Sequence, residues 1–132
     1  MAKFNVIFHK IYVANDGDGA FFAGDGEIYY EFHVDQDRIA EATRDEFVSV
    51  SDKETIQLSE ALLIERADTS QFVVTGSVAE ADGFTTGDDD FAGDFTHSYS
   101  GPDWVGIPCY REIRLKRAGV DVTVHYEIQR VS

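Results

Sequence analysis

Residues 120–131, VDVTVHYEIQRV, decide the fold class of this chain. Apolar and polar residues alternate along this stretch. The pattern predicts one face with Val120, Val122, Val124, Tyr126 and Ile128, and a second face with Asp121, Thr123, His125 and Glu127. A period of two residues is typical of a β-strand with one buried side. We therefore expect a strand here and a β-protein around it.

The same period recurs along most of the sequence. The first run is predicted to have one face with Phe4, Val6 and Phe8, and the opposite face with Ile7, Ile11 and Val13. The second run alternates from residue 28 to residue 35. Further strands are predicted at residues 38–50, 54–66, 71–81, 95–100 and 110–117. Eight strands joined by short turns predict an all-β fold, an eight-stranded antiparallel β-sandwich.

The region of residues 38–66 is open to two interpretations. The segments EATRDEF (41–47) and LSEALLIERAD (58–68) each fit either a helical turn or a strand with a bulge. The remaining pattern does not depend on this choice.

Length and charge limit the organisation and the partners of the chain. Its 132 residues, 43% of them hydrophobic, fit one domain over residues 1–132. A net charge of −14 argues against nucleic acid, and it allows contact with anionic lipid only through a bridging cation. The single Cys109 permits no internal disulfide. Neither a signal peptide nor a transmembrane stretch is recognisable, so the default expectation is a cytoplasmic protein.

Two glycine-rich segments hold much of the negative charge. Residues 15–27 (NDGDGAFFAGDGE) and 80–94 (EADGFTTGDDDFAGD) contain ten of the 25 acidic residues and neither Lys nor Arg. Crowded carboxylates repel one another unless a cation binds among them. A hard, oxygen-preferring cation such as Ca²⁺ is the expected ligand. The simpler alternative is that Asp and Gly only favour solvated turns.

The predicted strand order brings these two segments together. If direction alternates with each strand, the connections after strands one, three, five and seven share one end of the sandwich. These connections are residues 15–26, 51–53, 82–94 and 118–120. Both acidic segments would then meet, with Asp52 beside them.

At this point the chain resembles the C2 domain, an eight-stranded sandwich that binds Ca²⁺ and often phospholipid through loops at one end. The family's first loop ends in an Asp before the second strand, where this chain has Gly24-Asp25-Gly26-Glu27-Ile28-Tyr29. Its third loop resembles Glu80-Ala81-Asp82, Asp88-Asp89-Asp90 and Phe91-Ala92-Gly93. This chain departs from the family in Glu80, which replaces an Asp, and in a longer spacer. The loop positions resemble the permuted variant whose binding loops follow strands one, three and five.

The acidic segments and this resemblance together imply a set of calcium ligands. The set comprises Asp16, Asp18 and Asp25 from the first segment, Asp82, Asp88 and Asp90 from the second, and Asp52 as an outer candidate. An EF-hand reading of residues 16–27 fails, because its sixth position is Phe21 rather than Gly and its flanks are predicted strands.

Aromatic residues accompany the acidic segments. Phe21 and Phe22 lie in the middle of the first segment and Phe84 in the second. Beside a cation site they are expected to contact a membrane or a protein partner, although one of them could instead plug the end of the sandwich. Phe91 is predicted to be a core residue.

No catalytic motif is recognisable. His9, His33, His97 and His125 have no metal-binding or nucleophile spacing, and His33 and His125 are predicted on outward faces next to Glu31 and Glu127. We therefore expect a non-catalytic calcium-binding module that docks on a membrane or a partner protein. The alternative is a metal-independent structural or self-associating β-sandwich protein. The sequence indicates nothing about the oligomeric state.

Overall fold

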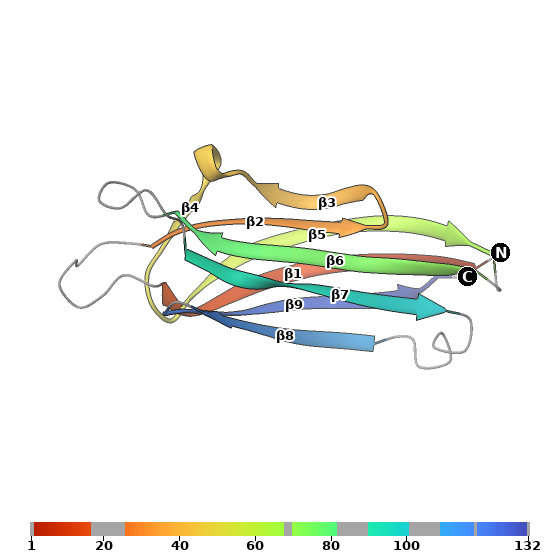
Figure 1. Ribbon diagram of the computed structural model, residues 1–132. Coiled ribbons are helices and arrows are strands. Elements are labelled where there is room, and N and C mark those ends of the chain that lie inside the picture. Colours follow the sequence, from red (N-terminus) through yellow and green to blue (C-terminus); the bar gives the residue numbers. More distant parts are fainter. Residues whose placement is uncertain are drawn as a thin grey trace.

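Two antiparallel sheets pack face to face in the computed structural model (Figure 1). It describes residues 2–16, 26–67, 70–81, 90–100, 109–117 and 119–131, with only the backbone of Asp90. The strands are β1 (Ala2–Asp16), β2 (Gly26–Val34), β3 (Asp37–Ala42), β4 (Val48–Val50), β5 (Glu54–Arg66), β6 (Gln71–Glu80), β7 (Asp90–Ser100), β8 (Cys109–Arg117) and β9 (Val120–Arg130), and a 3-10 turn, η1, spans Arg44–Glu46.

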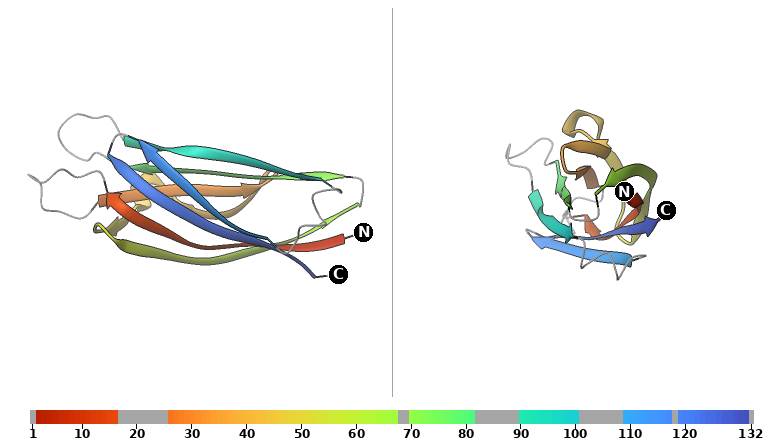
Figure 2. Two further views of the ribbon diagram at one scale, coloured as in Figure 1. Left: turned by 90° about the horizontal axis from the view of Figure 1, so that it is seen from below. Right: turned by 90° about the vertical axis from the view of Figure 1, so that its right-hand side faces the viewer.

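The first sheet has the order β5-β1-β9-β8, and the second has the order β3-β2-β6-β7 with β4 also paired to β2. The predicted antiparallel β-sandwich is confirmed. The strands run lengthwise through an elongated molecule, and β1 begins and β9 ends at the same end (Figures 1 and 2). Among the described residues, no helix is long and apolar enough to cross a membrane.

The core lies between the two sheets and is rich in aromatic rings. Phe8 of β1 stacks on Phe32 of β2 with ring centroids 4.5 Å apart, and on Tyr126 of β9 at 5.1 Å. All three rings are fully buried. Each buried ring of this size contributes a few kcal/mol through the apolar area it removes from water. The contact between Phe8 and Phe32 joins the two sheets, whereas Phe8 and Tyr126 pack within the first sheet.

The predicted strand at residues 38–50 is interrupted. β3 and β4 both pair with β2 in the same direction, and η1 lies between them. Of the two ambiguous segments, EATRDEF therefore contains a helical turn, whereas LSEALLIERAD is a bulged strand in which Ser59 has a φ of 52°. Because β3 and β4 run the same way, the interruption does not change the direction of later strands.

The predicted faces of the first strand are wrong after residue 8. Phe8 pairs with Tyr126 and Lys10 with His125, so His9 is an extra residue in β1. Such a β-bulge shifts the alternation by one. Ile11 is consequently buried on the same side as Phe8, and not on the opposite face.

A bulge also changes the seventh strand. It begins at Asp90, five residues before the predicted start, so residues 90–94 belong to a strand. Val78 pairs with Gly93 and Ala79 with Phe91, which leaves Ala92 as the extra residue. Ala92 is buried and Phe91 is 41% exposed. The prediction that Phe91 belongs to the core is therefore wrong.

Candidate cation-binding end of the sandwich

The strand ends that flank both acidic segments lie at one end of the molecule. Gly26 at the start of β2 pairs with Val50, and Ile28 pairs with Glu80 at the end of β6. Asp16 at the end of β1 pairs with Val120 at the start of β9. We call this the acidic end; Figure 1 shows it opposite the chain termini. The predicted convergence of the strand ends is confirmed.

Asp16 points into the sandwich at this end. Val13 pairs with Val122 and Asn15 with Asp121, so Ala14 forms a second bulge in β1. This bulge restores Asp16 to the inward face, and Asp16 is only 3% exposed. Its carboxylate Oδ2 accepts a hydrogen bond from the backbone N–H of Gly26 at 3.1 Å. A buried carboxylate is thereby fixed between β1 and β2.

Gly26 is required at this contact for steric reasons. A Cβ at position 26 would lie 2.3 Å from the Cβ of Asp16 and 3.2 Å from its Oδ2. Real Cβ atoms do not approach other atoms so closely, so a larger residue would displace the Asp16 carboxylate. Gly26, the last residue of the sequence Gly24-Asp25-Gly26 and the first residue of β2, thus has a packing role.

Asp52 joins the same group through the backbone. It lies in the turn between β4 and β5, and its Oδ1 accepts a hydrogen bond from the N–H of Asp16 at 2.9 Å. The next residue, Lys53, donates its N–H to the carbonyl oxygen of Val13 at 2.7 Å and has a φ of 64°. These two hydrogen bonds fasten the turn to the end of β1. Asp52 itself is exposed.

Glu80 is a second buried carboxylate that the predicted ligand set omits. It ends β6, is 3% exposed, and pairs with Ile28, two residues along β2 from Gly26. The sequence contained a signal for it, since Glu80 stands where the C2 pattern has an Asp. Burial of Asp16 and Glu80 at one end makes both side chains candidates for holding a cation.

Most of the predicted ligands lie outside the described residues. Asp18, Asp25, Asp82 and Asp88 are among them, as are Phe21, Phe22 and Phe84; for Asp90 only the backbone, in β7, is described. Within the described ranges, no group of three or more His, Cys, Asp or Glu side chains is arranged to hold a metal ion. The ligand set therefore stays a prediction, and Asp16 and Asp52 are the members that the structure connects, through the hydrogen bond from the Asp16 N–H to the Asp52 carboxylate.

The histidines on the outer faces have partly different partners from those predicted. His33 pairs with Glu31 as expected, with 2.5 Å between Nε2 and Oε1. Glu127, however, pairs with His9 at 2.7 Å, because His9 follows the buried Phe8 and so faces outward on the strand beside β9. Nδ1 of His125 instead shares a 3.0 Å hydrogen bond with the hydroxyl of Tyr110. Burial lowers the pKa of His125.

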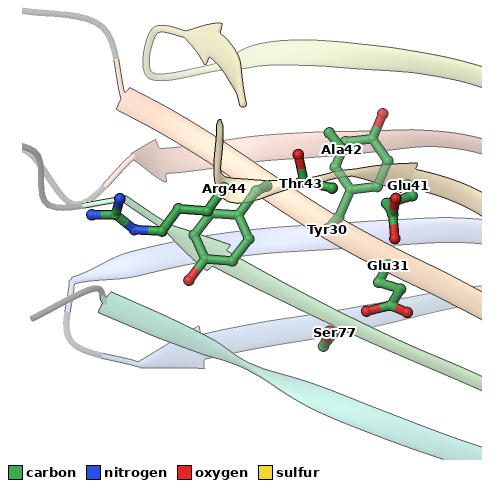
Figure 3. Close-up of a pocket in the computed structure, with 8 residues that line it drawn as sticks. Tyr30, Glu31, Glu41, Ala42, Thr43, Arg44 and Ser77 are labelled. Carbon is green, nitrogen blue, oxygen red and sulfur yellow. The ribbon is translucent and has the colours of Figure 1, made fainter. Parts of the chain in front are cut away.

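A pocket of about 250 Å³ lies on the outer face of the second sheet, against β2 and the segment from β3 to η1. Figure 3 shows Glu31 and Glu41 side by side within it, and the guanidinium of Arg44 pointing away from them. Both glutamates have basic partners, His33 for Glu31 and Arg38 for Glu41 at 2.9 Å. Both glutamates of the pocket thus already have partners from this protein, and we assign the pocket no ligand.

Comparison with solved structures identifies the fold. A structure of human GIVD cytosolic phospholipase A2 matches 98% of this chain with a TM-score of 0.54 and 9% identity. A structure holding the two C2 domains of Extended-Synaptotagmin 2 matches 99% of it with a TM-score of 0.52 and 10% identity.

This chain has a C2-like fold. It spans 17% of the phospholipase chain and 41% of the Extended-Synaptotagmin 2 chain. No protein-family model matches the sequence, and the comparison with curated proteins finds no match. At these identities the likeness concerns the C2 fold alone. The resemblance stated from the sequence motifs is confirmed at that level.

Proposed function

We propose that this C2-like domain is a non-catalytic module that binds Ca²⁺ at its acidic end and docks there on a membrane or a protein partner. The observation that carries the proposal is the pair of buried carboxylates, Asp16 and Glu80, at the end where both acidic segments begin. The carboxylate of Asp52 accepts a hydrogen bond from the backbone N–H of Asp16 at this end.

The physical reason is the cost of burying negative charge. A carboxylate withdrawn from water loses solvation, and several carboxylates at one end add mutual repulsion. The hydrogen bond from Gly26 offsets part of this cost for Asp16. A hard divalent cation would offset more, and carboxylate oxygens are the ligands that Ca²⁺ prefers. The residues present therefore fit calcium chemically.

Docking would follow from neutralisation of the acidic end. Without a cation, the charge repels anionic lipid or an acidic protein surface. With Ca²⁺ bound, the apolar residues of this end become able to enter a headgroup layer or a partner's groove. Phe21, Phe22 and Phe84 are the predicted contacts, and the exposed Phe91 next to Asp90 is a further candidate.

Titration calorimetry with Ca²⁺ tests the proposal. Asp52→Asn keeps the oxygen that accepts the Asp16 N–H and removes only the charge, so the fold is retained. We expect it to lower the calcium affinity by roughly tenfold, since the number of charged ligands tunes such sites. Asp37→Asn is the matched control, because Asp37 is exposed and pairs with Val34 at the far end of β2.

Two outcomes would contradict the proposal. If the wild-type chain releases or absorbs no heat and shows no other sign of binding at millimolar Ca²⁺, the metal-independent alternative takes its place. If Asp52→Asn and Asp37→Asn reduce affinity equally, calcium binds elsewhere on the domain.

A further inference from the structure

A chain of polar side chains crosses the apolar core between the two sheets. The hydroxyl of Tyr126, a fully buried residue on β9, lies 2.8 Å from the hydroxyl of Tyr99 and 2.7 Å from Nδ1 of His97, both on β7. Arg111 of β8 hydrogen-bonds to Tyr99, and its guanidinium carbon lies 5.9 Å from the centre of that ring. These four residues link β7 of one sheet to β8 and β9 of the other. We call them the inter-sheet clasp.

The protons of the clasp can be arranged in one way that satisfies every group. Arg111 only donates, so the Tyr99 oxygen accepts from it. Tyr99 then donates to Tyr126, and Tyr126 donates to Nδ1 of His97. Each hydroxyl donates once and accepts once. The last hydrogen bond, from Tyr126 to His97, forms only if Nδ1 has a free lone pair. This requires a neutral His97 with its proton on Nε2.

Protonation of His97 reverses the last hydrogen bond. Nδ1 then becomes a donor to Tyr126, whose own proton must turn toward Tyr99. The Tyr99 oxygen would accept from both Arg111 and Tyr126, and its own proton would have no acceptor within the clasp. Tyr99 is 4% exposed, so water does not readily replace that acceptor.

The surroundings of His97 oppose a positive charge. Burial lowers the pKa of His97, and the Arg111 guanidinium lowers it further. On β8 the other titratable group near the clasp is the half-buried thiol of Cys109. On β6 the register partner of His97 is the apolar Val74. Among the described residues, the buried carboxylate of β6, Glu80, pairs with Asp90 at the acidic end and so lies away from His97.

We propose that the inter-sheet clasp is acid-sensitive: protonation of His97 breaks its directional chain of hydrogen bonds and loosens β7 from β8 and β9. This inference is independent of calcium. It concerns the edge of the sandwich where β7 and β8 face each other, and it assigns a conformational role to a histidine that lacks any motif in the sequence.

Amide hydrogen exchange on the whole chain, in the presence of a chelator, tests the clasp at pH 7 and pH 5.5 after correction for the intrinsic pH dependence of exchange. In the wild type we expect protection of β7 and β8 to fall severalfold relative to β1 and β5 at the lower pH, because the opened state takes up the proton more readily than the closed clasp. His97→Asn should remove this effect, because the Asn amide oxygen can replace Nδ1 as acceptor and does not titrate. His33→Asn, which changes a half-buried histidine on the outer face of β2, should behave as the wild type.

Two results from the same samples would contradict the proposal. Equal acid-induced loss of protection in the wild type and His97→Asn would overturn the proposal, as would no loss in the wild type. A second measurement does not depend on the variant folding: an NMR titration of the His97 ring in the wild type. We expect the pKa of His97 to lie below the ordinary value of 6.5. Protection of β7 and β8 should fall over the pH range in which His97 becomes protonated. A value at or above 6.5 would overturn the clasp as well.

Discussion

At the residue scale, the acidic end depends on a contact between a glycine and a carboxylate. Gly26 leaves just enough space for the side chain of Asp16 and donates its N–H to it. Elsewhere in the core, Gly76 fills a comparable role between the rings of Phe32 and Phe95. The two glycines are equally tight, but only one of them touches the candidate cation site. This difference makes them a matched pair for separating stability from binding.

Gly26→Ala and Gly76→Ala should both destabilise the domain, by about 1–3 kcal/mol each, because an added methyl overpacks a filled space. Only Gly26→Ala should also weaken Ca²⁺ binding, since its Cβ displaces the Asp16 carboxylate. Chemical denaturation and calorimetry measure the two quantities. Equal calcium affinities in the two variants would show that the position of Asp16 does not matter to the site.

The ion pair between Arg114 and Asp121 gives a pH-dependent prediction. Hydrogen bonds from Arg114 at 3.0 and 2.7 Å hold the pKa of Asp121 below its usual range. A carboxyl whose pKa is lower in the folded state stabilises the fold above its unfolded pKa of about 3.9, and loses that contribution as the pH falls through the folded value.

Asp121→Asn should therefore lower the Tm slightly, on the order of a few degrees, at pH 6 and by less at pH 2. The pair is largely exposed on the Arg114 side, so solvent limits its effect. Thermal unfolding of both proteins across this range measures the difference, with Asp37→Asn as control. A Tm gap that persists unchanged at pH 2 would refute the assigned partner.

At the element scale, bulges decide which side chains face the core. In β1 the extra residues His9 and Ala14 set the inward positions of Ile11 and Asp16. In β7 the extra residue Ala92 places Phe91 outside. Bulged strands also twist more strongly, which suits a narrow sandwich whose sheets must close around a core of rings.

The bulge in β5 contains a strained residue that can be relieved. Ser59 has a φ of 52°, a left-handed conformation that costs a residue with a Cβ about 1–2 kcal/mol. Ser59→Gly should therefore raise the free energy of unfolding by up to about 1 kcal/mol, after the entropic cost of glycine. Ser59→Val should lower it. Urea denaturation compares the three proteins, and a Gly variant less stable than wild type would mean that the serine side chain makes an essential contact.

At the scale of the whole molecule, calcium binding should appear as added stability. A ligand that binds only the native state contributes about 2.7 kcal/mol at one hundred times its Kd, which for this size corresponds to a rise in Tm of several degrees. Calorimetric scans with 5 mM Ca²⁺ and with excess chelator measure the rise. A Tm that is the same in both conditions contradicts cation binding by the folded domain.

Membrane docking should require both the cation and the rings of the first acidic segment. Each Phe that enters the headgroup boundary adds about 1.5–3 kcal/mol if fully buried. Phe21→Ser combined with Phe22→Ser should abolish Ca²⁺-dependent pelleting with anionic vesicles without changing calcium affinity. Leu63→Ser is the control, because Leu63 is 60% exposed but pairs with Asn5, away from the acidic end.

Two other results of that sedimentation experiment are informative. If the wild type does not pellet with anionic vesicles at saturating Ca²⁺, a protein partner replaces the membrane in the proposed function. If the double variant unfolds, the rings plug the end of the sandwich and belong to its core.

The alternation of apolar and polar residues alone determined most of the strands and the fold class. The predicted strands at residues 71–81 and 110–117 agree with β6 and β8 to within one residue at each end, and the strand ends around both acidic segments meet as expected. Such a pattern is local, because successive side chains of a strand point to opposite faces whatever the strand pairs with. The acidic, glycine-rich composition likewise located the candidate site without reference to tertiary contacts.

Only the tertiary structure decided which residues face inward after each bulge and which polar groups meet. The buried Glu80, the exposed Phe91 and the clasp between His97 and Tyr126 all depend on pairing between strands distant in sequence. A bulge changes the register between two paired strands. Around His9, the register of β1 shifts in one direction against β5 and in the other against β9. Register is a property of strand pairs and of the filled core, so no single stretch of sequence contains it.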